Sequence, residues 1–412
     1  MIEFERFILK NGLTVLIHYD STTPFVVINT LYNVGAKDEN PKQTGFAHLF
    51  EHLMFGGSIN IPEYDIPLQN AGGENNAFTN NDFTNYYLTI PKTNLETGLW
   101  LESDRMLSLA FTQKSLEVQK KVVIEEFKQR YLNQPYGDVS HLIRNMAYTI
   151  HPYQWPTIGK DISHIEKATL NDVKQFFFNH YAPNNAILSL AGNITKDEVK
   201  PLIEKWFGNI PLRTIKKRSI PKEPIQTEKH ILTVKRNVAA SAIFKVFHMS
   251  DRHSRQYYTT DLISDILSSG KSSRLYQHLV KEKQLFTNIN AYISGSIDPG
   301  LFTIEGILNE NIKPEEAEKA IDMELQEISQ GNFTEKELTK VKNKFEANYI
   351  FSNYDLEERA LNLAYYELLG DANLINNEIN KYCQVSKNDI LDVAQKLFTP
   401  ENASVLYYIA EK

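Results

Sequence analysis

Two histidines and a glutamate stand close together in the sequence HLFEH at residues 48–52. On an α-helix His48 and His52 are one turn apart, so both imidazoles project from the same face and can reach one metal ion. Zn²⁺ accepts imidazole nitrogens at about 2.0–2.1 Å. Glu51 shares that side and can take a proton from water without being a ligand. The spacing predicts zinc-dependent hydrolysis; the alternative is two helix histidines beside a solvated glutamate.

A catalytic zinc ion needs a third protein ligand and one open coordination position. The segment KKVVIEEF at residues 120–127 offers two candidates, Glu125 and Glu126, directly after an apolar run. Neighbouring residues on a helix point about 100° apart, so only one of the two can face the metal. The spacing leaves the choice open, and the alternative is that both are surface acids on a charged helix.

Two predicted helices must hold these residues, at 43–56 for the histidines and at 114–132 for the acids. Strands cluster early in each half and helices follow, which predicts an α+β fold with mainly antiparallel sheets and helices packed on them. Further strands are expected at 3–10, 13–18, 25–34, 82–90, 185–191, 229–236, 241–248, 286–295, 301–307 and 403–409. Further helices are expected at 93–110, 138–148, 169–180, 256–267, 272–283, 313–329, 334–352, 356–368 and 386–398.

The chain repeats itself once, because residues 169–186 align without a gap with residues 386–403. Both segments open with a capping box, run as a short amphipathic helix, stop near a proline and enter an apolar strand. We interpret this as a duplication, although a chance match of a common pattern is the alternative. The proline-rich residues 211–229 are the predicted linker. This gives one domain at 1–210, which carries the predicted catalytic zinc site, and a homologous domain at 230–412, which has no HxxEH sequence and is expected to be non-catalytic.

The composition narrows the class of protein. The chain has 412 residues, of which 42% are hydrophobic and 23% charged, and this is typical of globular domains. With a net charge of -7 and no long basic run, we expect no nucleic-acid partner. We expect no membrane span either, since no stretch of 18 apolar residues occurs. The first residues lack a secretory signal pattern, which favours the cytoplasm, or the periplasm if a leader was removed.

Taken together, the motif and the VVIEEF segment at 122–127 resemble the pitrilysin/insulinase family of zinc peptidases, which carry the inverted HxxEH order. The chain length and the duplication resemble its bacterial branch, similar to mitochondrial processing peptidase. Three further stretches match: GGENNAFT at 72–79, HPYQWPTIG at 151–159 and SSRLY at 272–276. The resemblance covers nearly the whole chain.

The resemblance implies a role for each matching residue. It implies one zinc ion per chain, held by His48, His52 and Glu126, with Glu51 as the catalytic base. Asn76 and Ala77 match a pair that holds the substrate backbone on a strand edge. The implied activity is that of a zinc metalloendopeptidase that cleaves unfolded or short peptides inside a chamber.

Three positions depart from the family pattern. Gln119 stands where the family often has a glutamate supporting the ligand shell, and it carries no charge. Lys281 and Asn288 stand where active members have a substrate-contacting arginine and tyrosine. We therefore expect this chain to be the catalytic subunit of a heterodimer with a homologous partner chain. A homodimer is the alternative assembly, and a non-catalytic structural or binding subunit is the alternative function.

Overall fold

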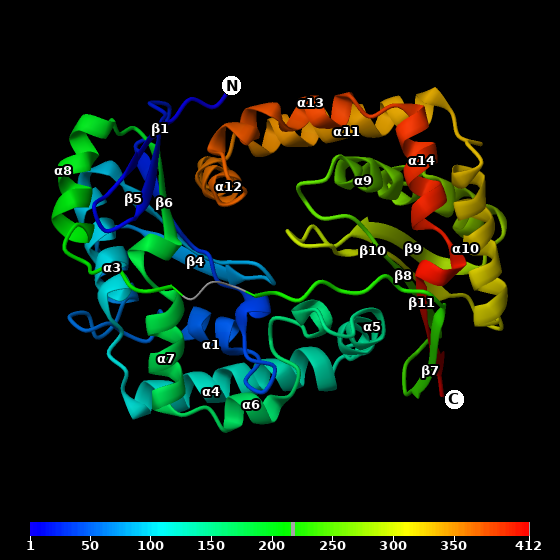
Figure 1. Ribbon diagram of the computed structural model, residues 1–412, viewed down its shortest axis with the longest axis horizontal. Coiled ribbons are helices and arrows are strands. Elements are labelled where there is room, and N and C mark those ends of the chain that lie inside the picture. The colour runs from blue at the N-terminus through cyan, green and yellow to red at the C-terminus, as the bar shows by residue number, and fades with distance from the viewer. Residues whose placement is uncertain (216–218, 412) are drawn as a thin grey trace. The chain divides into compact units, whose positions relative to one another are not determined.

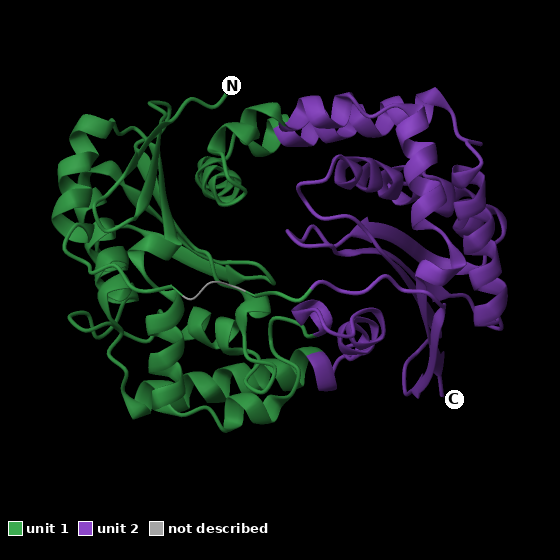
Figure 2. Ribbon diagram, viewed as in Figure 1, with its two compact units in different colours: residues 1–130, 155–221, 350–377 green, residues 131–154, 222–349, 378–412 purple. Residues whose placement is uncertain are grey.

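The structure, a computed structural model, describes residues 1–215 and 219–411. Contacts divide the chain into two compact units, which Figure 2 distinguishes by colour. Unit 1 contains residues 1–130, 155–221 and 350–377, and unit 2 contains residues 131–154, 222–349 and 378–412. Each unit thus includes one segment from the opposite half of the chain.

This division differs from the expected domains at 1–210 and 230–412 in two segments. Residues 131–154 pack with unit 2, and residues 350–377 pack with unit 1. Part of the expected linker at 211–229, residues 216–218, lies outside the described residues. The assignment of one domain as catalytic and the other as non-catalytic stays a prediction.

Unit 1 is built on a six-stranded sheet in the order β1-β2-β6-β3-β5-β4. Its strands are β1 (Glu5–Ile8), β2 (Thr14–Tyr19), β3 (Phe25–Tyr32), β4 (Glu74–Thr79), β5 (Thr84–Pro91) and β6 (Ala186–Gly192). Among these described strands only β2 and β6 run parallel. All of β6 and nearly all of β3 are buried, so the core follows the middle of the sheet, while β4 forms one edge.

The helices of unit 1 pack on this sheet or on one another (Figure 1), and two of them, α1 and α4, contain the motif residues. They are α1 (Phe46–Leu53), α2 (Asp65–Asn70), α3 (Leu95–Leu107), α4 (Gln113–Phe127), α6 (Ile162–Glu166), α7 (Leu170–His180), α8 (Lys196–Phe207) and α12 (Leu356–Leu368). Helix α1 packs against α4 and against the edge strand β4. Helix α12 packs on β3 and β6, with Ala360 buried against Val27 and Ala191.

Unit 2 is built on a five-stranded sheet in the order β7-β11-β8-β10-β9. Its strands are β7 (His230–Arg236), β8 (Ala242–His248), β9 (Phe286–Ile293), β10 (Leu301–Leu308) and β11 (Ala403–Ala410). Its helices are α5 (Val139–Ala147), α9 (Arg255–Ser268), α10 (Pro314–Ser329), most of α11 (Glu335–Ser352), α13 (Glu378–Cys383) and α14 (Lys387–Leu397). Among the described strands of unit 2, only the neighbours β7 and β11 are parallel to each other.

The repeated sequence folds alike in both units. Helices α7 and α14 each begin with a complete capping box, from Thr169 and from Ser386, and each is followed by a single turn that begins at a proline. The next strand then enters the sheet between one parallel and one antiparallel neighbour, as β6 does in unit 1 and β11 in unit 2. The predicted helix–turn–strand repeat is therefore confirmed at this local level.

The predicted fold class, α+β with mainly antiparallel sheets, is confirmed, and two local predictions need correction. The expected helix at 272–283 is instead largely π-helical, over η6 (Tyr276–Glu282), and the end of the expected helix at 114–132 is the π-helical η3 (Lys128–Leu132). Strand β4 was expected only through the family resemblance at Asn76 and Ala77, and helices α2, α6, α8 and α13 were not predicted. In the part of the chain that the structure describes, no helix has the length and apolar character needed to cross a membrane.

Candidate metal centre

Helix α1 separates apolar from polar residues by its periodicity. Phe46, Leu49, Phe50 and Leu53 are buried. The Phe50 ring packs against three aromatic rings of the segment around α7, those of Phe176, Phe177 and Tyr181. This packing fixes the rotation of the helix about its axis. His48, Glu51 and His52 are left on the less buried side, with side chains 12%, 19% and 24% exposed.

Glu126 on α4 lies against both histidines. Its Oε2 is 3.1 Å from His48 Nε2 and 3.5 Å from His52 Nε2. One ligand atom from each of the three residues falls within 4.8 Å of the others. Two imidazole nitrogens and one carboxylate oxygen are a donor set typical of catalytic zinc, which keeps a fourth position open. The residues present therefore fit a zinc ion.

The structure distinguishes the two adjacent acids on α4. The Glu125 side chain is 61% exposed and pairs with Lys128 at 2.7 Å. Glu126 points the other way, toward the imidazoles, while its second oxygen pairs with Arg130 at 3.1 Å. The helical geometry that allows only one acid to face the histidines thus places Glu126 there.

The electrostatics of the cluster favour positive charge. Burial opposes protonation of His48, but hydrogen bonds to Glu126 and Glu51 outweigh it and raise the pKa of His48 to about 9. Hydrogen bonds from His48 and His52 lower the pKa of Glu126. Burial acts to raise the pKa of Glu51, but hydrogen bonds from His48 and Thr79 and the charges of the two histidines together outweigh it, and the pKa is lowered. A divalent cation would compete with protons for these same groups, because metal ligands must be deprotonated.

Glu51 stands beside the donor cluster rather than in it. Its Oε2 is 3.5 Å from His48 Nδ1, and the group of potential ligands consists of His48, His52 and Glu126 among the residues described. A partly exposed carboxylate at this place can accept a proton from water near the metal position.

Asn76 and Ala77 lie on the edge strand β4, which contacts α1. They pair with Tyr87 and Tyr86 on one side, and β4 has no further strand on its other side in the described sheet. Asn76 is exposed, and its Oδ1 accepts the Ala77 N–H at 2.8 Å. An edge of this kind offers backbone groups to an added strand.

The three positions that differ from the family pattern lie on three different elements. Gln119 is partly buried on α4. In unit 2, Lys281 is exposed on the π-helical segment η6, and Asn288 is exposed on β9, an edge strand of its own sheet. The structure brings together His48, Glu51, His52 and Glu126 and places Asn76 and Ala77 on a neighbouring strand.

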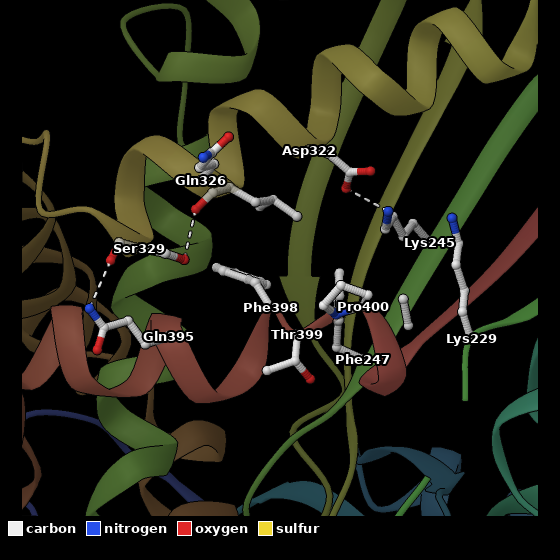
Figure 3. A pocket seen from close by; sticks show the side chains of 12 residues that line it. Lys229, Lys245, Phe247, Asp322, Gln326, Ser329, Gln395, Phe398, Thr399 and Pro400 are labelled. Atoms are coloured by element: carbon white, nitrogen blue, oxygen red, sulfur yellow. Dashed lines mark hydrogen bonds and ion pairs between the residues drawn. The ribbon is translucent and has the colours of Figure 1, made fainter. Parts of the chain in front are cut away.

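A cavity of about 510 Å³ lies within unit 2 (Figure 3). Lys245 and Lys229 stand at one side of it, and Phe247 and Phe398 form an apolar wall. Both ammonium groups are neutralised, because Glu318 on α10 lies 2.7 Å from each and Asp322 lies 2.5 Å from Lys245. The charges therefore hold α10 to the sheet, and none of the predicted site residues lines this cavity.

The side chains that hold α1 in place could not be predicted from the sequence. Glu39 and Trp155 are buried and hydrogen-bond to each other, and Glu39 also binds the start of α1. Trp155 belongs to the HPYQWPTIG segment, which was noted only as a family match. No periodicity or spacing connects residue 39 with residue 155, so the sequence alone carried no signal for this contact.

Residues 14–161 match the family model described as Insulinase (Peptidase family M16), and residues 167–345 match the model described as Peptidase M16 inactive domain. The chain belongs to peptidase family M16. The first match contains α1, β4 and α4, and therefore all the predicted metal, base and substrate-binding residues.

Relatives within M16 extend over almost the entire chain. The zinc protease PqqE of Helicobacter pylori is 29% identical, over 98% of this chain and 92% of that protein. An uncharacterised zinc protease of Bacillus subtilis, YmxG, is 26% identical over 98% of this chain and 97% of its own length. The crystal structure of a protease from Helicobacter pylori superposes with a TM-score of 0.92 at 28% identity, covering 99% of this chain and all of that one. The two-domain M16 fold is thus shared over the full length.

Proposed function

We propose that this chain is a zinc-dependent endopeptidase that hydrolyses unfolded or short peptides. The observation that carries the proposal is the cluster of His48, His52 and Glu126, with Glu51 directly beside it. The names of the M16 relatives support a peptidase that uses zinc. A donor set without an adjacent base would fit a structural metal equally well, so Glu51 favours catalysis.

His48, His52 and Glu126 would hold the zinc ion. The ion, when bound, supplies a Lewis acid that polarises a carbonyl and makes water more acidic. Glu51 accepts the proton of the attacking water and later donates it to the leaving amine. The hydrogen bonds and packing of α1 and α4 keep the four side chains oriented, so little reorganisation is needed during the reaction.

The edge strand β4 is the proposed binding element for substrate. An extended peptide can add to a free sheet edge through main-chain hydrogen bonds, which do not depend on sequence. Asn76 supplies an additional amide on that edge, next to the partly buried Ala77. This mode requires an unfolded or short substrate, because a folded protein does not offer a free strand. Enclosure of that substrate in a chamber belongs to the same proposal.

The alternative function is that of a non-catalytic structural or binding subunit. It is favoured by Lys281 and Asn288, which stand in place of the arginine and tyrosine expected in active members. We propose instead that these contacts come from a homologous partner chain, in a heterodimer, with a homodimer as the alternative. The cytoplasmic location likewise stays a prediction.

The test combines metal analysis with a cleavage assay. Purified chain should contain close to one zinc per molecule. It should cleave members of a mixed peptide library, poorly alone and far better with a homologous partner chain, with a chelator abolishing the cleavage and added zinc restoring it. A chain that holds zinc but cleaves nothing, alone or with homologous partners, would favour the structural subunit. A chain that holds no zinc would overturn the proposal.

A further inference from the structure

The first turn of α1 is capped from a distant loop. Its N-cap residue is Gly45, in the left-handed region with φ 86, and glycine has no side chain that could accept hydrogen bonds. The first N–H groups of a helix need an outside acceptor. Glu39 supplies it, because Gly45 N–H donates to Oε2 at 2.9 Å and Ala47 N–H donates to Oε1 at 2.8 Å. Both carboxylate oxygens are therefore used at the start of the helix.

Glu39 is itself held firmly. It is 6% exposed, and Trp155 Nε1 donates to its Oε2 at 3.1 Å and to the Ala36 carbonyl at 3.0 Å. Burial raises the pKa of Glu39 to about 8, although the hydrogen bonds from Ala47, Gly45 and Trp155 act to lower it. A buried carboxyl group is costly unless its oxygens are paired, and here they accept three N–H groups.

The opposite side of the turn is equally fixed. A side chain on Gly45 would place its Cβ 2.6 Å from the Ile158 carbonyl oxygen, so the loop at 158–160 touches the backbone there. Lys160 N–H donates to Thr44 Oγ1 at 2.8 Å. The start of α1 thus lies between this loop and the Glu39 carboxylate, immediately before the first histidine of the motif.

Metal ligands tolerate displacements of only about 0.2 Å from their preferred distances. His48 follows Ala47 directly, so a shift of the first turn moves its imidazole relative to Glu126, which is on a different helix. We propose that Glu39 is a positioning residue for the metal centre, whose carboxylate fixes the first turn of α1 and thereby sets the metal affinity of the site. The inference rests on the proposed zinc site, but its structural part concerns α1 alone.

The test compares Glu39→Gln with Asp38→Asn. Both remove one carboxylate from the same loop. Asp38 accepts a hydrogen bond from the Gly35 N–H, whereas Glu39 accepts from the Gly45 and Ala47 N–H groups at the start of α1. In Glu39→Gln an amide NH₂ must face one of the helix N–H groups. We expect zinc affinity, measured by competition with a chromophoric chelator, to fall about 10- to 100-fold, as is typical for residues that orient ligands. Amide exchange at Ala47 should accelerate, and kcat should fall with little change in KM, while Asp38→Asn keeps wild-type values.

Urea unfolding of the same variants separates positioning from general destabilisation. Equal stability of the two variants with weaker zinc binding only in Glu39→Gln would support the proposal. Unchanged zinc affinity and unchanged Ala47 exchange in Glu39→Gln would overturn it. If Glu39→Gln does not fold, Trp155→Phe decides, since it removes one donor to the carboxylate and should weaken zinc binding several-fold; wild-type affinity there would also overturn the proposal. If the wild-type chain binds no zinc, the proposed function fails, and Ala47 exchange still shows whether Glu39 anchors α1.

Discussion

Glu51 shares a helix with two histidines, yet its carboxylate stands outside the cluster of ligand atoms. We therefore predict that Glu51→Gln keeps zinc and loses hydrolysis. Loss of a general base typically lowers the rate by about 10²–10⁴-fold. Atomic absorption measures the zinc, and a quenched fluorescent peptide measures turnover. Loss of zinc from the variant would make Glu51 a ligand and contradict its assigned role.

The adjacent acids on α4 allow a matched comparison at the residue scale. Glu126→Gln should weaken zinc binding strongly, because it removes the charged oxygen that faces both imidazoles. Glu125→Gln makes the same chemical change at an exposed position and should keep wild-type zinc content. A zinc titration of both variants checks this. The opposite ranking would show that the wrong glutamate had been assigned.

The sequence predicts the position of a site residue well where its spacing from the other site residues matches the period of a helix. The spacing of His48 and His52 is enough to place two imidazoles on one face. Spacing alone left Glu125 and Glu126 undecided; the family resemblance favoured Glu126, and the structure orients it toward the histidines. Glu39 could not be predicted, because its partners come from the turn before the motif and from residue 155, and such contacts arise only from the tertiary fold.

At the scale of elements, the edge strand β4 gives a test of substrate binding. Asn76→Ala removes an exposed amide from the edge and should raise KM several-fold, as expected for loss of about one hydrogen bond of roughly 1 kcal/mol. Asn75→Ala is the control, since Asn75 lies on the same strand but donates to Asp65 at 2.9 Å. Peptide kinetics of both variants decide the matter. Equal KM values for the two would argue against an added strand on β4.

The Glu318 carboxylate, which joins helix α10 to its sheet, changes its protonation at low pH. Burial acts to raise the pKa of Glu318, but hydrogen bonds from Lys229, Lys245 and Tyr407 outweigh it and lower the pKa to about 2. Because the folded pKa lies below the ordinary value of 4.5, this group stabilises the fold fully above pH 4.5 and loses that contribution as the pH falls toward 2. Between pH 5 and pH 3, urea unfolding should show a smaller loss of stability for Glu318→Gln than for wild type. Parallel curves would contradict this.

Most elements with a regular apolar period were predicted, and the exceptions have physical causes. Strand β4 reads ENNAFT, whose polar residues resemble a loop, because an edge strand needs little apolar surface. Helix α8 contains Pro201, which weakens its helical pattern in the sequence. Helix α12 was predicted, but its place on the sheet of unit 1 was not, since periodicity says that a face is buried and not what buries it.

For the whole molecule, we predict that the isolated chain binds zinc yet cleaves peptides poorly. Lys281 lacks the planar fork of arginine and Asn288 lacks an aromatic ring, so contacts to the transition state would be missing. A homologous chain that retains the arginine and tyrosine should restore activity when mixed with this one. The measurement is kcat/KM for the lone chain and for the mixture. Full activity of the lone chain, unchanged by the partner, would contradict the prediction.

The duplication could be predicted from the sequence because its helix caps and prolines are local signals, and the structure repeats them in α7 and α14. The sequence did not predict that residues 131–154 belong to unit 2 and residues 350–377 to unit 1. It depends on which surfaces meet after folding, and no local pattern records that. Sequence therefore predicts the parts of this molecule more reliably than their grouping.

The placement of α12 on the sheet of unit 1 has a consequence for folding of the chain during its synthesis on the ribosome. The sheet of unit 1 is fully synthesised once β6 has emerged, but Val27 and Ala191 wait for Ala360 to cover them. At about 5–20 residues per second, that delay lasts on the order of ten seconds or more. During this interval the nascent chain presents an apolar sheet face to the cytosol, so a chaperone that shields such surfaces has a defined interval in which to act. A chain stalled before residue 350 cannot complete unit 1, however well its first half is made.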